Sequence, residues 1–273
     1  MLQIQRIESL DLPELAPYRT MRYQLDHRQQ GIFVAESAKV ARRLIESDWP
    51  VISLVLMEKW LPAFEKHLAH RKENIRVFVA EKELLDKLTG YPTYQGVMAL
   101  GKIPPRQNLE SVLAKTSRPL LLVAADGIVN AQNMGALIRN CAAFSVNALL
   151  VGETCCSPFM RRSVGGSMGT IFRLPALELS DLAGTLRQLH ARGIRCLAAH
   201  AHTNQKALPQ AGFSHDCCIV LGSEGEGIRP MVLEQCDEHI AIPMPPDVDS
   251  LNVGSATAIF LYEAARQRGT MKR

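Results

Sequence analysis

The chain has 273 residues, and its content of 47% hydrophobic and 21% charged residues is typical of a folded protein rather than a disordered one. No stretch approaches the ~20 apolar residues that a membrane-spanning helix needs, and the N-terminus lacks the apolar block of a signal peptide. The formal net charge of +4 permits an RNA or other polyanionic partner without requiring one. We therefore expect a cytoplasmic protein with no membrane association.

The seven cysteines agree with a reducing compartment. Their number is odd and no C-x-x-C occurs; instead there are two adjacent pairs, Cys155-Cys156 and Cys217-Cys218. Neither pair has the spacing of a zinc site, and the histidines, including His200 and His202, show no H-x-x-x-H pattern. We expect free thiols that behave as small buried residues, and no bound metal.

Residues 1–103 are predicted to form a small α/β domain, because apolar runs alternate there with helical patterns. Ser37 is placed to cap one of the helices, and Gly90 to end another. The strands are expected over 32–35, 51–57, 75–79 and 95–100, and the helices over 38–47, 58–71 and 81–88. Residues 104–118 begin with a double proline and continue with polar residues, which predicts a linker.

Residues 119–273 are predicted to form a second domain with a more regular alternation. Its strands are apolar along their whole length, which favours a parallel sheet with helices on both faces. The strands are expected over 120–125, 146–151, 194–199, 217–221 and 239–242, and the helices over 133–144, 181–191 and 252–266.

Residues 130–139, with the sequence NAQNMGALIR, lie where a predicted strand gives way to a helix. Ligands of α/β sheets collect at such carboxyl ends of strands. Asn133 and Arg139 are six residues apart, about 1.7 helical turns, so they do not share a helix face. They can meet only if Asn133 lies in the turn before the helix. The plainer alternative is that Asn133 is a helix cap and Arg139 a solvated side chain.

Two further segments are candidates for the walls of a pocket. Residues 221–228, LGSEGEGI, carry three glycines that let a backbone approach a ligand closely, but in neither the dinucleotide-binding nor the P-loop order. Their two carboxylates favour a neutral or cationic ligand, and a tight turn with no ligand is the alternative. Residues 242–252, IPMPPDVDSLN, form a stiff apolar loop suited to an adenine-like ring, with Ser250 or Asn252 as the cap of the last helix.

Arg161-Arg162, followed by small residues up to Gly169, offers a phosphate contact or a solvated helix end.

In this order, the motifs NAQNMGALIRN, LGSEGEGI and IPMPPDVDSLNVGSA resemble those of the SpoU (TrmH-like) family of RNA 2'-O-ribose methyltransferases, within the SPOUT class. The resemblance is strong over residues 119–268. Residues 1–103 are similar to the family's L30e-like substrate-binding domain through FVAES and YQGVMAL. The resemblance implies a parallel sheet with a deep trefoil knot, S-adenosylmethionine as cofactor, and a homodimer that completes the site.

By position, the resemblance also implies roles for nine residues. Cofactor binding falls to Gly222, Ile242, Met244 and Leu251, and the reactive end to Asn133, Arg139, Glu224, Ser250 and Asn252. In this family, the arginine at the position of Arg139 is proposed to act as the base that removes the hydroxyl proton, but a guanidinium hardly deprotonates in a protein. We prefer Arg139 as a clamp on the adjacent phosphate that stabilises alkoxide charge.

The chain departs from the usual family pattern at four places. Asn130-Ala131 replaces Asp-Pro, Asn140 replaces Thr, Ser145 replaces Gly, and Gly254 replaces Ser. None of these changes removes a residue with an implied role in the reaction. They concern the fit of the substrate and the local packing of helices.

The leading prediction is thus an S-adenosylmethionine-dependent methyltransferase of RNA ribose 2'-hydroxyls. The two-domain layout and the absence of long basic tails favour rRNA over tRNA as substrate. A catalytically inactive RNA-binding protein of the same fold, acting in ribosome assembly, is the alternative. A dinucleotide-dependent oxidoreductase is disfavoured because G-x-G-x-x-G is missing after the first strand.

Overall fold

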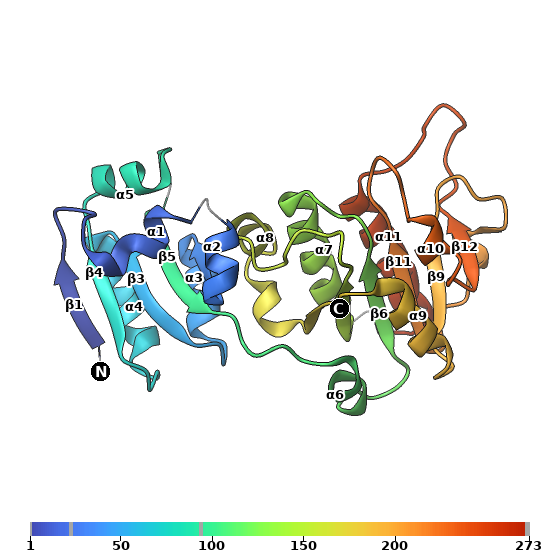
Figure 1. The fold of residues 1–273 in the computed structure, drawn as a ribbon, viewed down its shortest axis with the longest axis horizontal. Coiled ribbons are helices and arrows are strands. Elements are labelled where there is room, and N and C mark those ends of the chain that lie inside the picture. The colour runs from blue at the N-terminus through green and yellow to red at the C-terminus, as the bar shows by residue number, and fades with distance from the viewer. Residues whose placement is uncertain (1, 22–23, 93–94, 271–273) are drawn as a thin grey trace. The chain divides into compact units, whose positions relative to one another are not determined.

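The structure, a computed structural model, describes residues 2–21, 24–92 and 95–270 (Figure 1). It consists of two compact units. The first comprises the residues up to Pro105 together with Phe159–Phe172, and the second comprises Arg106–Pro158 and the residues from Arg173 onward. None of the helices in the described ranges combines the length and apolarity that crossing a bilayer requires.

The first unit is built on a five-stranded mixed sheet with the order β1-β4-β3-β5-β2. The parallel strands are β1 (Leu2–Arg6), β4 (Ile75–Val79) and β3 (Val51–Leu56), while β5 (Val97–Lys102) runs antiparallel to both β3 and β2 (Ile32–Glu36). Its main helices are α1 (Ala16–Arg19), α2 (Gln24–Gln30), α3 (Ala38–Ile45), α4 (Leu61–Leu68) and α5 (Lys82–Thr89).

The strands and helices predicted between Ile32 and Lys102 are confirmed within a few residues. Ser37 caps α3 by accepting a hydrogen bond from the backbone N–H of Val40 (3.4 Å), and Gly90 ends α5 in the left-handed conformation (φ 73°). The sequence did not predict β1, α1 or α2. In β1 every residue is exposed, because the strand lies at the sheet edge, and so it carries no continuous apolar run.

Residues 159–172 follow Pro158 of the second unit in sequence but pack within the first. The ring of Phe172 lies 5.6 Å from that of Phe33, and the ring of Phe159 lies 5.8 Å from that of Trp49. Helix α8 (Arg161–Gly166) begins in this segment, and Arg161 forms an ion pair with Glu36. Arg161 is therefore neither solvated nor free for a phosphate, whereas Arg162 is exposed.

The second unit contains a seven-stranded, fully parallel sheet, as predicted, with the order β10-β12-β9-β11-β6-β7-β8. The strands are β6 (Leu121–Ala125), β7 (Ala148–Val151), β8 (Ala176–Glu178), β9 (Arg195–Ala199), β10 (Lys206–Ala207), β11 (Cys217–Leu221) and β12 (Glu238–Ala241). From β6 the chain proceeds to β7 and β8, then crosses to β9 beyond β11. The strand order therefore reverses between β6 and β11, where ligands of such sheets bind.

Helices cover both faces of this sheet, also as predicted. The helices are α6 (Leu109–Ala114), α7 (Ala131–Ala143), α9 (Leu182–His190), α10 (Pro230–Leu233) and α11 (Val253–Gln267). Side chains of α6, α9 and α10 share one buried core with alternate residues of the strands. On the other side α7 and α11 pack against each other and against β7 and β11.

The segment predicted as a linker, residues 104–118, contains helix α6. Asn108 caps this helix, and Leu109 and Val112 enter the core beside α9. These two apolar residues are three apart, a spacing typical of a helix, but the preceding double proline favoured a linker. The residues that join the compact units are thus fewer than predicted, and the boundary lies after Pro105.

Candidate active site

A pocket opens at the carboxyl ends of β9, β11 and β12 in the second unit. It is lined by the end of β9 with the residues after it, by the glycine-rich loop after β11, by the loop after β12 and by the first turns of α11. The lining residues are 199–202, 221–227, Ile240, Ile242, Met244, Ser250, Leu251, Val253, Ala256 and Phe260. They include all four residues predicted to hold the cofactor, namely Gly222, Ile242, Met244 and Leu251.

The glycine loop, residues 222–228, is a closed turn. The backbone N–H of Ser223 donates to the Gly227 carbonyl oxygen (2.9 Å), and the N–H of Gly227 donates back to the Ser223 carbonyl oxygen (3.1 Å). A Cβ on Gly222 would lie 2.2 Å from the carbonyl carbon of Gly227, so only glycine fits there. The loop is thus a tight turn that also lines the pocket.

Asn252 connects three of the segments that the sequence singled out. Its side-chain oxygen accepts a hydrogen bond from the N–H of Gly254 (2.9 Å), so Asn252 rather than Ser250 caps α11. Its side-chain amide donates to the side-chain oxygen of Asn133 (3.1 Å) and to the Glu224 carboxylate. We call Asn133, Glu224 and Asn252 the polar triad.

Asn133 joins the polar triad from a position that the sequence did not predict. Asn130 is the cap of α7 and accepts a hydrogen bond from the N–H of Gln132 (2.8 Å), so the prediction of Asn133 as the cap is wrong. Asn133 does not lie in the preceding turn either, which was the condition for meeting Arg139. Helix α7 starts two residues earlier because Asn130 can itself cap it. Asn133 lies in the first turn of α7.

Arg139 lies about 9 Å further along the same helix, from a rise of 1.5 Å per residue. It is exposed and makes no hydrogen bond or ion pair with any described residue. The structure of one chain therefore brings Asn133, Glu224 and Asn252 together, with Ser250 in the adjoining pocket wall, but not Arg139.

Two of the departures from the family pattern contact each other. The Asn140 side-chain amide donates to the Gly254 carbonyl oxygen (2.7 Å), which joins α7 to α11. A Cβ on Gly254 would lie 3.0 Å from that of Ala136, so glycine permits the close approach of the two helices. Ser145 has a positive φ of 57°, a conformation that glycine adopts without strain.

The sequence also missed the part that His200 plays in the pocket. His200 follows β9 and lines the pocket with His202, and its ring centroid lies 5.8 Å from that of His239. Desolvation, followed by the nearby His239 and His202, lowers the pKa of His200. Its position directly after an apolar strand was the available signal, since the carboxyl ends of parallel strands meet at one edge.

The cysteines are free thiols, as predicted, and four of them are buried: Cys141, Cys196, Cys217 and Cys218. The other three are partly buried, and desolvation raises the pKa of Cys155 to about 11, which keeps that thiol protonated at neutral pH. Across the described ranges, no three histidine, cysteine or carboxylate side chains are grouped so that they could hold a metal ion.

The fold is a parallel α/β sheet with a pocket at the carboxyl ends of β9, β11 and β12, next to the point between β11 and β6 where the strand order reverses. The model of the SpoU rRNA Methylase family matches residues 120–262, which is more than half of the chain. The chain therefore belongs to the SpoU rRNA methylase family.

Relatives and solved structures are similar over most of the chain. The chain is 36% identical over 194 residues to the 23S rRNA (guanosine-2'-O-)-methyltransferase RlmB of Vibrio vulnificus, and the match covers 70% of this chain and 77% of the relative. It is 29% identical over 273 residues to an uncharacterized tRNA/rRNA methyltransferase of Mycobacterium bovis, covering 97% and 93%. The SpoU methyltransferase AviRb from Streptomyces viridochromogenes, solved in complex with AdoMet, has the same fold, with a TM-score of 0.82, 22% identity and coverage of 96% and 100%.

Proposed function

We propose that this protein transfers a methyl group from S-adenosylmethionine to a ribose 2'-hydroxyl of RNA, and that the RNA is ribosomal. The observation that carries this proposal is the single pocket lined by Gly222, Ile242, Met244 and Leu251, with Glu224 of the polar triad in its wall. Family membership, the rRNA 2'-O-methyltransferase among the relatives and the AdoMet complex of AviRb support it.

The pocket residues suit this cofactor. Gly222 allows the loop to close, because a Cβ there would meet the backbone of Gly227, and the half-buried Ile242, Met244 and Leu251 offer apolar surface to an adenine ring. The carboxylate of Glu224 favours a cationic ligand over a pyrophosphate. When bound, S-adenosylmethionine supplies an electrophilic methyl group on a positively charged sulfur.

The chain's own residues have to align the ribose oxygen with that methyl group and assist loss of the hydroxyl proton. Asn252 is fixed by its bond to Gly254 and holds Glu224 in place through its amide. Glu224 is the one carboxylate among the nine predicted residues, and is the group that can accept the proton. Arg139 binds the neighbouring phosphate and stabilises negative charge on the oxygen through its guanidinium group.

A second copy of the chain completes the site in this proposal. Helix α11 exposes Ile259 and Tyr262, 38% and 51% accessible, three residues apart on one face. Such an apolar face is the kind of surface that a homodimer covers. Arg139, exposed on the neighbouring helix α7, would then serve the pocket of the partner.

The trefoil knot remains an implication of the family resemblance.

The first unit is proposed to bind the RNA substrate, as the L30e-like resemblance of residues 1–103 implies. The first unit, residues 1–105 with 159–172, contains 17 Lys and Arg against 13 Asp and Glu, which accounts for the formal net charge of +4. The seven free thiols support a reducing compartment, the cytoplasm, as the place of action.

The test is the transfer of labelled methyl from S-adenosylmethionine to rRNA and tRNA pools from cells that lack the protein. We expect label in rRNA as an alkali-resistant 2'-O-methyl nucleotide, and its loss with Arg139→Ala. Label in tRNA alone would overturn the ribosomal assignment. Absence of cofactor binding in calorimetry would overturn the enzymatic function and leave an RNA-binding protein as the better account.

A further inference from the structure

The glycine loop is held at both ends by one residue, Asp126, which has no predicted role in binding or catalysis. Asp126 directly follows β6, and its backbone N–H donates to the carbonyl oxygen of Leu221, the last residue before the loop (2.8 Å). Its carboxylate accepts a hydrogen bond from the backbone N–H of Arg229, the first residue after the loop (2.8 Å). Asp126 thus fixes where the loop leaves β11 and where it ends.

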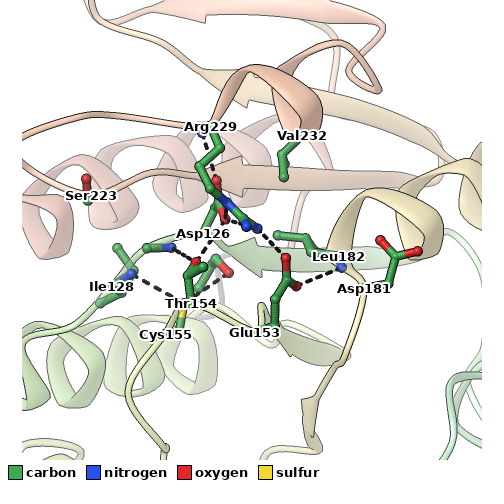
Figure 2. Close-up of polar contacts among 12 residues, drawn as sticks. Asp126, Ile128, Glu153, Thr154, Cys155, Asp181, Leu182, Ser223, Arg229 and Val232 are labelled. Carbon is green, nitrogen blue, oxygen red and sulfur yellow. Dashed lines mark hydrogen bonds and ion pairs between the residues drawn. The ribbon is translucent and has the colours of Figure 1, made fainter.

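The side chain of Arg229 closes this arrangement (Figure 2). Its Nε donates to the same Asp126 carboxylate (2.8 Å), and its guanidinium also pairs with Glu153 after β7 (2.6 Å). The Asp126 side chain is fully buried and that of Arg229 is 26% exposed. We call Asp126 and Arg229 the carboxyl-edge ion pair.

A buried charge of this kind is costly unless its partners stay in place. The buried Asp126 carboxylate is satisfied by the backbone N–H and the guanidinium of Arg229, with the Thr154 hydroxyl donating at 3.4 Å, and the contacts with Arg229 fix the residue at which the loop ends. Glu153 in turn accepts a hydrogen bond from the N–H of Leu182 at the start of α9 (2.9 Å), which anchors the pair to a helix. The loop is therefore held by charge as well as by its internal hydrogen bonds.

We propose that Asp126 and Arg229 are positioning residues that hold the glycine loop in the conformation that binds S-adenosylmethionine. This inference rests on the proposed function for the identity of the ligand. The restraint on the loop is a property of the chain alone. Gly222 and Glu224 reach the pocket from a loop whose two ends are fixed before the cofactor arrives, which lowers the ordering cost of binding.

The experiment compares loop mobility and cofactor affinity in matched variants. Asp126→Asn keeps the size of the side chain but turns an N–H₂ or a weaker oxygen toward the guanidinium. In the ligand-free protein, we expect hydrogen exchange in the peptide that covers residues 221–229 to become about tenfold faster. We expect the Kd for S-adenosylmethionine in calorimetry to rise by about tenfold. Arg229→Lys, which loses the planar fork, gives a second test if Asp126→Asn does not fold.

Asp216 provides the control, because it is a buried aspartate at the opposite ends of the same two strands. It precedes β11, accepts a hydrogen bond from the N–H of Leu120 (2.7 Å) and pairs with Arg118. Asp216→Asn should lower the melting temperature without altering loop exchange or Kd. Equal effects of the Asp126 and Asp216 variants on the loop, or no effect of either Asp126→Asn or Arg229→Lys, would overturn the inference. Faster loop exchange in a protein that does not bind S-adenosylmethionine would support the restraint on the loop by Asp126 and Arg229 and would overturn the proposed function.

Discussion

In the seven-stranded sheet, the side where the strands begin and the side where they end each carry an Asp–Arg ion pair, and the two pairs have different roles. We call these sides the amino edge and the carboxyl edge. At the amino edge, Asp216 and Arg118 pair beside the starts of β6 and β11, and at the carboxyl edge Asp126 and Arg229 pair beyond their ends. The amino edge is then closed by Arg268, which donates to several backbone carbonyls. The carboxyl edge instead supports a glycine loop and an open pocket. An Asp–Arg ion pair therefore does not by itself indicate a functional site, because its role depends on the segment of the chain that it fixes.

The largest effect on stability is expected at the amino edge. The Arg268 side chain donates to the carbonyl oxygens of Phe213, Pro119, Leu120 and His215 at 2.6–2.9 Å. Arg268→Ala removes the donor from the carbonyl oxygens of Phe213, Pro119 and His215, while Leu120 keeps the N–H of Cys217, and should lower the free energy of unfolding by about 3 kcal/mol. Urea titration measures the loss. If Arg268→Ala also changed the Kd for S-adenosylmethionine at temperatures where the variant is folded, the ion pairs of the two edges would not have separate roles.

The largest effect on rate is expected on the pocket side, with little change in stability. Arg139 is exposed, and Arg139→Lys keeps the charge but loses the bidentate geometry. We expect kcat to fall by about 100-fold, the cost of one lost charge-stabilising donor. Single-turnover methyl transfer is the measurement, with Arg187→Lys on the surface of α9 as the control. A lysine variant with near-normal turnover would rule out the phosphate-clamp role.

A smaller effect is expected for Asn252, whose cap and polar contacts combine both kinds of role. Asn252→Ala should cost about 1 kcal/mol of stability through loss of the α11 cap. It should also raise the KM for S-adenosylmethionine, because Glu224 loses its hydrogen-bond partner. Asn108→Ala removes the cap of α6 and is the matched control. If both variants changed KM alike, the polar triad would have no special role.

The smallest effect is expected from His200, through pH. Desolvation and then His239 and His202 lower its pKa in the folded protein, so the unfolded chain binds the proton more readily. The stability that neutral His200 contributes is present above its ordinary pKa of 6.5 and is lost as the pH falls through that value toward the folded-state pKa. The pKa of His27 in the first unit is also lowered, mainly by desolvation.

The two histidines are separated by measuring thermal stability between pH 7.5 and 5.5 in His200→Gln and His27→Gln. Each variant should show a shallower acid loss than the wild type. Cofactor Kd should rise on acidification in the wild type and in His27→Gln, because a protonated His200 repels a cationic ligand in the pocket it lines. A Kd that rises equally in His200→Gln would assign the effect to another group.

Sequence patterns were sufficient where one element carries its own signal. The strand over 217–221 and the cap at Ser37 follow from apolar runs and side chains that act within a few residues, whereas the cap of the last helix was left open between Ser250 and Asn252. The patterns failed where the signal is weak or shared. The exposed edge strand β1 has no apolar run, and the double proline obscured helix α6. The packing of residues 159–172 on the first unit depends on aromatic contacts more than 100 residues away in sequence.

The sequence by itself determined the parallel α/β class and, through three motifs, the family and several of the residues that line the pocket. Only the tertiary structure decided that Asn252 would join Asn133 to Glu224 and that Asp126 would tie both ends of the glycine loop. Local patterns reflect interactions within one element. A buried carboxylate such as Asp126 is satisfied by groups from the segments that follow other strands, namely Arg229 after β11 and Thr154 after β7, and these meet only when the sheet has formed its order.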